Sequence, residues 1–418
     1  MGDAKELAIN EGTTVRTTPW PSRGLIGIEE KQAVDALFDE AIASGVAPGY
    51  NGAQEEAYCH EFADLMGGGF ADAVNSGTTA LYVALRALDL EPFTEIAVSC
   101  ITDPGGMMPI PLLNCIPVPI DTAPGSYNVG PEQVEAAITP LTSAIVIAHI
   151  HGEPADMDGI LAVARHHGIP VVEDCAQSHG ATLHGRPVGT FGAVAAFSTM
   201  FGKHHCTGGQ GGVVFTRSED LYWRIRGAAD RGKPFGLPTG STNQLASLNF
   251  NLNEFACAIG CVQLRKLPDI VAKRRAMAAR IREGLDGAAA CSVAESIPEA
   301  EASYWKLRLV FRPDAVRCTK SEFCAALGTE GLTVSAETDC HTTPHLQDWF
   351  TKRRVFGTSG YPWASQDYKG DRDREFPCPN LTAVRETSLV LFFDEAWTEQ
   401  EADDTVAILR KVEAAHQC

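Results

Sequence analysis

The sequence predicts an α/β fold in which a mainly parallel sheet is covered by helices on both faces. Over the first two thirds of the chain, short apolar runs alternate with amphipathic stretches of helical spacing. Most of the apolar runs are unbroken, which is typical of strands buried on both faces. Regular alternation of such strands with helices favours parallel pairing. With 44% hydrophobic residues among 418, the chain can bury a sizeable core.

The elements can be placed along the chain in order. Apolar residues at helical spacing predict helices over Thr79–Leu88, Pro131–Ala137 and Asp158–His166. The predicted strands, in chain order, are Ala71–Val74, Ile96–Val98, Ile116–Ile120, Ala144–Ala148, Val171–Glu173, Val194–Phe197 and Val213–Phe215.

A change of pattern near residue 255 predicts a smaller C-terminal α+β domain. Residues 255–290 form one long helical stretch, which we expect Pro268 to bend or break. Because such a helix often joins two domains, we expect a large domain with an N-terminal arm over 1–262 and a smaller one over 263–418. The smaller domain is expected to contain strands over Trp305–Phe311 and Ser388–Phe393, a terminal helix over Glu399–Val412, and irregular loops over 339–380.

Charge and cysteine content restrict the partners and the compartment. The chain has 34 Lys and Arg against 53 Asp and Glu, for a net charge of −19. We therefore expect neither nucleic acid nor an anionic membrane surface as a partner. No apolar run approaches the ~18–20 residues of a membrane span, and MGDAKELAIN lacks the apolar core of a signal peptide. The 13 cysteines include no C-x-x-C pair, which indicates reduced thiols of a cytoplasmic protein.

The segment NSGTTAL (75–81) follows a predicted strand and opens a predicted helix. The small residues Ser76, Gly77 and Thr78 would let backbone N–H groups at the helix N-terminus approach an anion such as a phosphate. An ordinary helix cap and turn explains the same pattern.

A second segment, VVEDCAQSHG (171–180), places Glu173 and Asp174 at the end of a buried strand. Parallel sheets bind ligands at that edge. An Asp there can form a charged hydrogen bond to a protonated ring nitrogen and keep it cationic. The alternative is an Asp that caps the next helix.

A third segment, FSTMFGKHHCTGGQGGVVF (197–215), holds Lys203 between an apolar strand and a glycine-rich loop. This setting allows a lowered pKa and Schiff-base chemistry, whereas a lone Lys is usually a surface charge. The neighbouring His204 and His205 do not predict a metal site, because adjacent residues rarely point at one ion.

Two further polar segments have simple explanations on their own. The Asn-rich turn LASLNFNLNEF (245–255) precedes the long helix, which Asn251 or Asn253 could cap. The basic run Lys352-Arg353-Arg354 is expected to be a solvated turn, and contact with a substrate phosphate is the alternative.

Taken together, the phosphate cradle, the strand-end Asp and the Lys about 30 residues later describe a pyridoxal 5′-phosphate (PLP) site. At this point the chain resembles the DegT/DnrJ/EryC1/StrS family of sugar aminotransferases, which has the aspartate aminotransferase fold (fold type I). The resemblance covers residues 20–290 closely and the rest loosely. It rests on SGTTAL, HIHGEPADMDGI (149–160), VVEDCAQSHGA, GRPVGTFG (185–192), FSTMFGK followed by GGQGG, and NFNLNEFACAIG.

The resemblance implies roles for individual residues. Lys203 corresponds to the lysine that forms a Schiff base with PLP and moves the proton between Cα and C4′. Asp174 corresponds to the partner of the pyridine nitrogen, and Gln177 to a residue near the 3-hydroxyl. The residues implied at the cofactor phosphate are Ser76, Gly77, Thr78, Ser198 and, reaching over from the neighbouring subunit, Asn251. The family pattern therefore implies a homodimer with shared active sites.

Three features depart from the family pattern. Asp103 occupies the place of an aromatic residue that stacks on the pyridine ring in many members. Phe93-Thr94 replace the usual Gly-Asp before the strand at 96–98. The 339–380 region aligns only loosely, which points to an acceptor other than the commonest nucleotide-linked ketosugars.

The resemblance implies a PLP-dependent aminotransferase that moves an amino group from glutamate or glutamine to a keto group of a sugar or cyclitol. The setting would be amino-sugar or antibiotic biosynthesis. A sugar dehydratase of the same family is the first alternative, but those members carry His in place of the lysine. A non-catalytic PLP-binding regulator is the second, and the chain offers no basic DNA-binding module.

Overall fold

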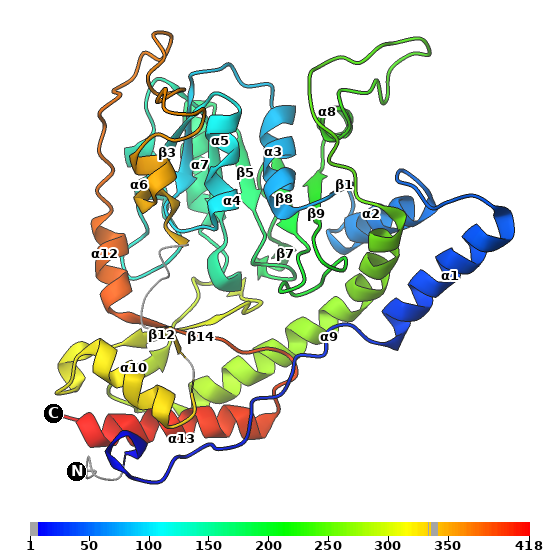
Figure 1. Ribbon diagram of the computed structural model, residues 1–418. Coiled ribbons are helices and arrows are strands. Elements are labelled where there is room, and N and C mark those ends of the chain that lie inside the picture. The colour runs from blue at the N-terminus through cyan, green and yellow to red at the C-terminus, as the bar shows by residue number, and fades with distance from the viewer. Residues whose placement is uncertain (1–6, 333, 336–341) are drawn as a thin grey trace.

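The computed structural model describes residues 7–332, 334–335 and 342–418, and its centre is a seven-stranded sheet (Figure 1). The strand order is β1-β9-β8-β5-β4-β2-β3. The only antiparallel pairs in this sheet, within the described residues, are those that β9 forms with β1 and β8. The bounds are β1 Phe70–Val74, β2 Glu95–Ser99, β3 Ile116–Ile120, β4 Thr142–Ala148, β5 Val171–Asp174, β8 Val194–Ser198 and β9 Gly212–Thr216. All seven predicted strands are confirmed within two residues.

Helices cover both faces of this sheet, as the unbroken apolar strands predict. One face packs against α3 (Gly77–Ala87), α4 (Pro104–Met107), α5 (Pro109–Leu112) and α8 (Glu219–Ala229). The other face packs against α2 (Ala53–Leu65), α6 (Pro131–Ala137), α7 (Met157–His167) and the start of α9 (Glu254–Gly284). Because successive side chains of a strand point to opposite faces, each strand contributes to both cores.

A second sheet forms the C-terminal part, in the order β10-β12-β14-β13. Its strands are β10 Cys291–Val293, β12 Leu307–Phe311, β13 Val334–Ser335 and β14 Ser388–Leu391. Helices α10 (Lys320–Thr329) and α13 (Glu399–His416) and the end of α9 enclose its core. Both strands predicted here are confirmed, each two residues shorter, and so is the terminal helix.

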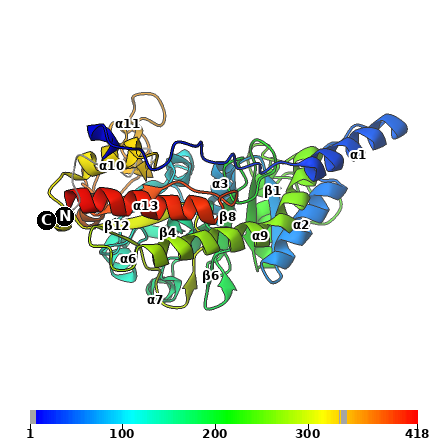
Figure 2. The same cartoon turned by 90° about the horizontal axis from the view of Figure 1, so that it is seen from below.

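Helix α9 corrects one expectation. It is continuous from Glu254 to Gly284, with Pro268 inside it, and it ends before residue 290. Of the two expected effects of Pro268, a break is therefore wrong and a bend stays a prediction. An internal proline removes one helix hydrogen bond at a cost of about 3 kcal/mol. Buried Leu267 and Ile270 beside it, and packing of α9 on α1, α2 and α13, offset that cost (Figure 2). The predicted domain boundary at 262/263 falls within this helix and stays a prediction.

The remaining described elements are short. A three-stranded sheet joins β11 (Ala300–Glu301), β6 (Thr182–Leu183) and β7 (Arg186–Pro187). Of the predicted irregular region, 339–341 lie outside the described residues. The rest contains η6 (Pro344–Leu346), α11 (Asp348–Thr351) and the first residues of α12 (Pro379–Glu386). Single turns of 3-10 helix are η2 (Ala8–Asn10), η3 (Ile150–Gly152) and η4 (Pro313–Ala315). Among the described residues, no helix is long and apolar enough to cross a membrane.

The N-terminal arm runs along the C-terminal part and then leaves the body of the molecule as helix α1 (Ile28–Ser44) (Figures 1 and 2). Arg16 pairs with Glu401 at 2.9 Å, and Trp20 stacks on Trp397 with ring centroids 4.4 Å apart. These contacts anchor the arm before α1 begins.

Candidate active site

The strand ends of the large sheet enclose a cavity of about 210 Å³. Six of the residues that the sequence predicts for the cofactor line this cavity together. They come from the start of α3 (Ser76, Gly77, Thr78), the end of β5 (Asp174), the end of β8 (Ser198) and the following loop (Lys203). The rest of the wall is formed by Leu81, Asp103, Gly105, Gly106, Ala176, Met200 and Gln210.

The N-terminus of α3 faces this cavity. Ser76 caps the helix by accepting from the Thr79 amide at 3.1 Å. The first amides of a helix have no acceptor inside it, so those of Gly77 and Thr78 remain available for an anion. A Cβ at residue 77 would lie 2.5 Å from the Ser198 Cβ, so only glycine fits there. The Ser198 side chain therefore stands next to the helix N-terminus.

Asp174 is buried, with its side chain at the cavity wall. Its carboxylate accepts from Thr102 Oγ1 at 3.2 Å and from the Ala176 amide at 3.1 Å. Burial raises the pKa of this carboxyl, while the Ala176 amide, the Lys203 ammonium and the Thr102 hydroxyl oppose the shift. A cationic group placed in the cavity beside Asp174 would favour the charged carboxylate.

Lys203 lies in the loop between β8 and β9, and its side chain is buried. The loop is held by its own backbone, since Lys203 N donates to Met200 O at 2.9 Å and Thr199 N to Gly211 O at 2.8 Å. Burial lowers the pKa of the Lys203 amine to about 8, against the attraction of Asp174 and Asp103. The neutral and therefore nucleophilic form of this amine is much more populated near neutral pH than in an ordinary lysine.

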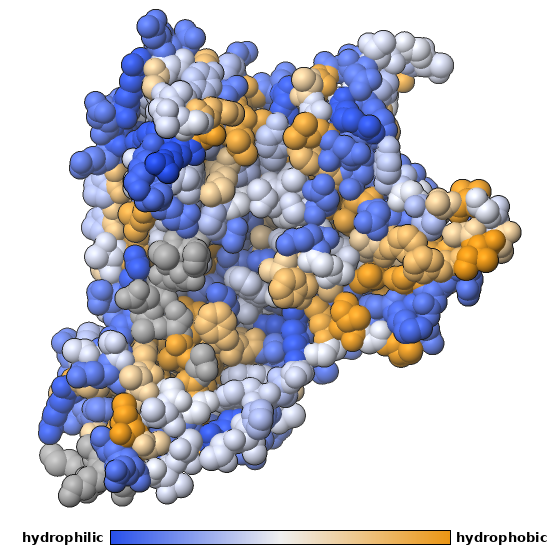
Figure 3. Space-filling view, in the orientation of Figure 1, coloured by the Kyte–Doolittle hydropathy of each residue, from blue (hydrophilic) through white to orange (hydrophobic). Residues whose placement is uncertain are grey.

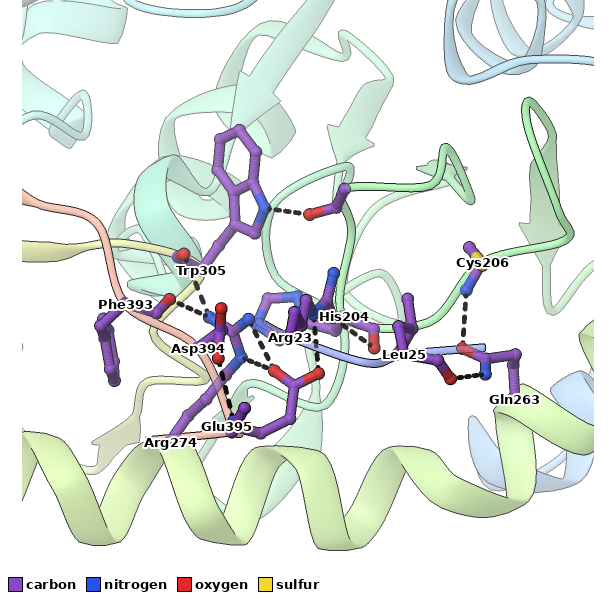
Figure 4. A network of polar contacts seen from close by, with 12 residues as sticks. Arg23, Leu25, His204, Cys206, Gln263, Arg274, Trp305, Phe393, Asp394 and Glu395 are labelled. Atoms are coloured by element: carbon purple, nitrogen blue, oxygen red, sulfur yellow. Dashed lines mark hydrogen bonds and ion pairs between the residues drawn. The ribbon is translucent and has the colours of Figure 1, made fainter. Parts of the chain in front are cut away.

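Trp305 packs against Lys203 from the C-terminal part of the chain. The Lys203 Nζ lies 3.8 Å from the centroid of the Trp305 ring. The indole Nε1 donates to Gly202 O at 2.9 Å (Figure 4). The side chains of Trp305 and Lys203 therefore hold each other in place at the cavity.

An ion-pair network lies behind this contact (Figure 4). Buried Arg274, on α9, pairs with Glu395 at 2.7 Å and donates to Tyr304 O and Trp305 O at 3.0 and 3.2 Å. Arg23 in the N-terminal arm pairs with the other Glu395 oxygen at 2.7 Å and donates to His204 O at 3.1 Å. The network thus connects the arm, the lysine loop and the C-terminal part. Sequence reasoning missed it, because its members are far apart in the chain.

Two predicted cofactor residues do not line the cavity of their own chain. The Gln177 Oε1 accepts from His151 N at 2.8 Å, which fixes the turn after β4. Asn251 forms an isolated bridge with Val74, and its Nδ2 donates to Asn249 Oδ1 at 2.8 Å. Their roles toward a cofactor stay predictions.

Asp103 stands where the family pattern has an aromatic residue, and it is exposed. Its carboxylate caps the short helix α4 by accepting from Gly105 N at 2.9 Å. A Cβ at Gly106 would lie 2.2 Å from Thr102 Oγ1 and 3.1 Å from Asp174 Oδ2. The glycine turn therefore packs close to Asp174.

The other polar clusters considered from the sequence have structural partners. His204 and His205 are buried, and burial is the main reason that the pKa of each imidazole lies well below its ordinary value. The Nε2 atoms contact Ser303 O at 3.0 Å and the Tyr58 hydroxyl at 2.9 Å. Lys352 is exposed as expected, but Arg353 packs over the rings of Phe350 and Trp363, so this part of the basic run is not a solvated turn.

This combination of an α/β fold with a buried lysine, a strand-end Asp and a helix N-terminus around one cavity defines a fold type I transferase site. The chain belongs to the DegT/DnrJ/EryC1/StrS aminotransferase family, which matches residues 29–362. The resemblance predicted from the motifs is confirmed.

Curated relatives agree with this assignment. The chain is 35% identical over 292 residues to the L-glutamine:2-deoxy-scyllo-inosose aminotransferase of Micromonospora echinospora, covering 67% of this chain and 68% of the relative. It is 32% identical over 364 residues to the enzyme of the same name from Streptomyces lividus, covering 84% of each. The protein is an aminotransferase, and the dehydratase and regulator alternatives are not supported.

Solved structures show the same fold over nearly the whole chain. The aminotransferase of Psychrobacter cryohalolentis matches with a TM-score of 0.81 at 29% identity, covering 95% of this chain and 98% of that one. DesV of S. venezuelae matches with a TM-score of 0.75 at 27% identity, covering 92% and 95%. The predicted fold class, including the smaller C-terminal α+β part, is confirmed.

The cavity fits PLP on the chemistry of its donors. The phosphate of PLP needs amide and hydroxyl donors, which Gly77, Thr78 and Ser198 present. The ring nitrogen needs a buried carboxylate and the aldehyde needs a neutral amine, and the cavity offers Asp174 and Lys203 for these purposes. The Gly77 position, where a Cβ would collide with Ser198, keeps the approach to the helix amides open.

Proposed function

We propose that this aminotransferase binds PLP in the cavity of Asp174 and Lys203 and transfers the amino group of glutamine to the keto group of a cyclitol related to scyllo-inosose. Glutamate is the alternative donor, and a ketosugar the alternative acceptor. The observation that carries the proposal is the buried Lys203 amine, with a pKa lowered to about 8, in one cavity with the strand-end carboxylate. Support for the substrates comes from relatives named as glutamine:inosose aminotransferases.

Each residue has a distinct task. When bound, PLP supplies an electron sink for the carbon that gains or loses a proton. Gly77, Thr78 and Ser198 hold its phosphate, and α3 adds the positive end of its dipole. The Asp174 carboxylate holds a proton on the ring nitrogen, because a buried cation needs a charged partner.

Lys203 has two tasks. Its neutral amine bonds the cofactor, and once released it moves a proton between the substrate carbon and the cofactor as general base and acid. A pKa near 8 suits both directions of that transfer at physiological pH. The Trp305 ring limits where the released amine can go, since the two side chains are in contact.

Asp103 offers the cavity a group that can bind a polyol. It lines the cavity, it is exposed, and its carboxylate accepts hydrogen bonds from hydroxyl groups. This supports a hydroxyl-rich acceptor, which a cyclitol is.

We further propose that the catalytic unit is a homodimer. Helix α1 leaves the body of the molecule and exposes Ile28, Phe38 and Ile42 by 63%, 52% and 80%, an apolar surface visible in Figure 3. Contiguous exposed apolar surface of this kind marks an interface. Asn251, which does not line its own cavity, would then serve the partner's phosphate site.

A cytoplasmic location belongs to the same proposal. Every cysteine in the described part of the chain is a free thiol. Free buried thiols fit a reducing compartment.

The substrate proposal is tested with the purified, PLP-loaded enzyme. Its absorbance is followed as glutamine or glutamate is added, and then as scyllo-inosose, 2-deoxy-scyllo-inosose or a nucleotide-linked ketosugar is supplied. We expect glutamine to bleach the lysine-bound cofactor and an inosose to restore it, with an aminocyclitol detected by mass spectrometry. Turnover with the nucleotide-linked ketosugar alone would contradict the cyclitol assignment.

The dimer is tested by mixing Lys203→Ala chains with Asn251→Ala chains, provided that each variant alone is inactive. In a heterodimer one shared site carries both changes and the other carries neither, so activity should partly return. An active monomer in sedimentation, or no recovery in verified heterodimers, would contradict shared sites.

A further inference from the structure

A cluster of two thiols and a carboxylate lies at the carboxyl edge of the large sheet, outside the residues that line the candidate active-site cavity. Cys100 directly follows β2, Asp121 directly follows β3, and Cys378 precedes α12. The two Sγ atoms and a carboxylate oxygen of Asp121 all lie within 4.8 Å of one another. Cys100 is 0% exposed and Cys378 is 9% exposed. The cluster is therefore shielded from solvent by three separate segments.

A buried imidazole lies beside the cluster. His345, in η6, is 4% exposed and its side chain interacts with the Cys378 thiol. Its Nδ1 has no hydrogen-bond partner among the described residues. A buried polar atom without a partner costs about 1–3 kcal/mol. A ligand at this position would remove that cost.

Simple apolar packing does not explain the cluster. Cys100 and Cys378 do belong to an apolar cluster with Leu381 and Val384, as small buried thiols often do. Packing of the two thiols alone, however, leaves an Asp121 carboxylate oxygen within 4.8 Å of both sulfurs. It also leaves the buried Nδ1 of His345 without a partner among the described residues.

We propose that Cys100, Asp121, His345 and Cys378 bind one Zn²⁺ ion in a structural site. Two sulfurs, one imidazole nitrogen and one carboxylate oxygen are donors that Zn²⁺ accepts in a tetrahedral arrangement. Two Zn–S bonds of about 2.3 Å at a tetrahedral angle place the sulfurs about 3.8 Å apart. That separation is within the 4.8 Å limit that the three clustered ligand atoms satisfy.

Asp121 is already oriented for this task. Its two oxygens accept from the amides of Thr122, Asn380 and Leu381 at 2.8–3.0 Å. Oδ1 accepts two of these bonds and Oδ2 accepts one, so Oδ2 retains a lone pair for a metal. Hydrogen-bonded groups of this kind commonly fix metal ligands in place. With four protein ligands the ion has no open position, so the site is structural rather than catalytic.

The ion would brace the wall of the active-site cavity. Thr102, two residues after Cys100, donates to Asp174 through its hydroxyl and to Thr342 O at 3.0 Å through its amide. Cys100 lies on the same segment as Thr102, and His345 lies on the same segment as Thr342. A metal bound by both would therefore hold the sheet edge and the segment before η6 together. The site is independent of which substrate the enzyme uses.

The test uses full-length, tag-free protein purified with reductant and without chelators, and metal content is measured by plasma mass spectrometry. We expect about one Zn²⁺ per chain. Cys378→Ala and His345→Ala should lower it to below about a tenth of that value. Cys115→Ala is the matched control, because Cys115 is also buried but lies at the opposite end of β3. That variant should keep its zinc.

Cobalt substitution keeps the proposal testable if the variants fold poorly. Co²⁺ replaces zinc in the wild-type chain, and tetrahedral thiolate ligation gives absorbance bands in the red, where PLP does not absorb. Equal zinc contents in Cys378→Ala and Cys115→Ala, or no red bands with Co²⁺, would overturn the proposal. A Cys100–Cys378 disulfide in freshly prepared reduced protein would overturn it as well.

Discussion

Glu173 and Asp174 are adjacent buried acids at the end of one strand, yet their surroundings differ. Glu173 accepts from the amides of Gly189, Phe191 and Gly192 at 2.6–2.8 Å and contacts His149 Nε2 at 3.1 Å. Asp174, pointing to the opposite face, has two donors in the described part of the chain and borders the cavity. His149, Glu173 and Cys175 cluster closely enough to suggest a metal, but both imidazole nitrogens of His149 already have partners, Glu173 at 3.1 Å and the Ala155 amide at 3.0 Å.

The comparison shows that burial of a charge does not by itself mark a functional residue. A buried carboxylate surrounded by amides stabilises a fold, because its hydrogen-bonding capacity is used. A buried carboxylate with unused capacity at a cavity wall needs a ligand. The two neighbours therefore provide a structural and a functional acid that can be tested side by side.

The largest expected effect is that of removing the amine that Asp174 faces. Lys203→Ala should lower turnover by at least about 10⁴-fold, since both bonding of the cofactor and proton transfer depend on this group. The chain should still fold. Turnover and the absorbance of the lysine-bound cofactor are measured together. Retention of that absorbance in the variant would show that another lysine holds the cofactor.

Asp174→Asn should lower kcat by roughly 10²–10³-fold, equivalent to about 3–4 kcal/mol in barrier. The cofactor should remain bound through its phosphate, and thermal stability should change little. Steady-state kinetics and a PLP titration give these quantities. Nearly normal kcat would rule out a role at the ring nitrogen.

Glu173→Gln should give the opposite pattern. Its new NH₂ group would face amide donors, so we expect a loss of about 2–4 kcal/mol in unfolding free energy. The kcat of the folded, PLP-loaded fraction should stay within about threefold of wild type. Denaturant unfolding is compared with active-site titration. A specific loss of kcat without destabilisation would remove the distinction between the two acids.

A smaller effect is expected from pH. The folded pKa of Lys203, about 8, lies below its ordinary value of 10.5, so the buried ammonium destabilises the apoprotein below pH 8 and the penalty disappears as the pH rises to 10.5. For the same reason, the rate of PLP attachment to apoenzyme should rise with pH and level off above about 8. Stopped-flow absorbance measures this rate. A flat profile from pH 6 to 9 would exclude a titrating lysine.

The smallest effect is expected from the network behind Trp305. Arg274→Lys keeps the charge but loses the donors that reach two backbone carbonyls and Glu395 together. We expect kcat to fall about three- to tenfold with little change in PLP affinity, because the Lys203 amine is less well positioned. Trp305→Phe keeps an aromatic ring beside Lys203 but loses the single indole donor to Gly202 O. It serves as the comparison and should lose less.

The sequence predicts those site residues that lie close to a strand end along the chain. Asp174 and Ser198 end their strands, and Gly77 and Lys203 follow strands β1 and β8 within five residues. Unbroken apolar runs therefore suffice to place all four at one edge of the sheet. Thr102, Trp305 and Arg274 reach the site through tertiary contacts between distant segments, which periodicity does not encode.

Features of the fold that depend on tertiary contacts are likewise not predicted by the sequence. The antiparallel direction of β9 depends on how the loop with Lys203 turns back. The amino-acid composition of a strand does not indicate its direction. Pro268 is tolerated because helix packing outweighs one lost hydrogen bond. The sequence does not predict that apolar residues of α1 are exposed, because their spacing is also that of a buried helix.

We propose that Lys203, in the cavity with Asp174, is the residue that holds the cofactor. Lys306 is the natural rival, because its Nζ also lies near the Trp305 ring, at 4.8 Å. Holoenzyme reduced with borohydride, digested and sequenced by mass spectrometry distinguishes the two. We expect the pyridoxyl phosphate group on Lys203 at close to one per chain. Its recovery on Lys306 or any other lysine, or its absence, would show that Lys203 does not hold the cofactor.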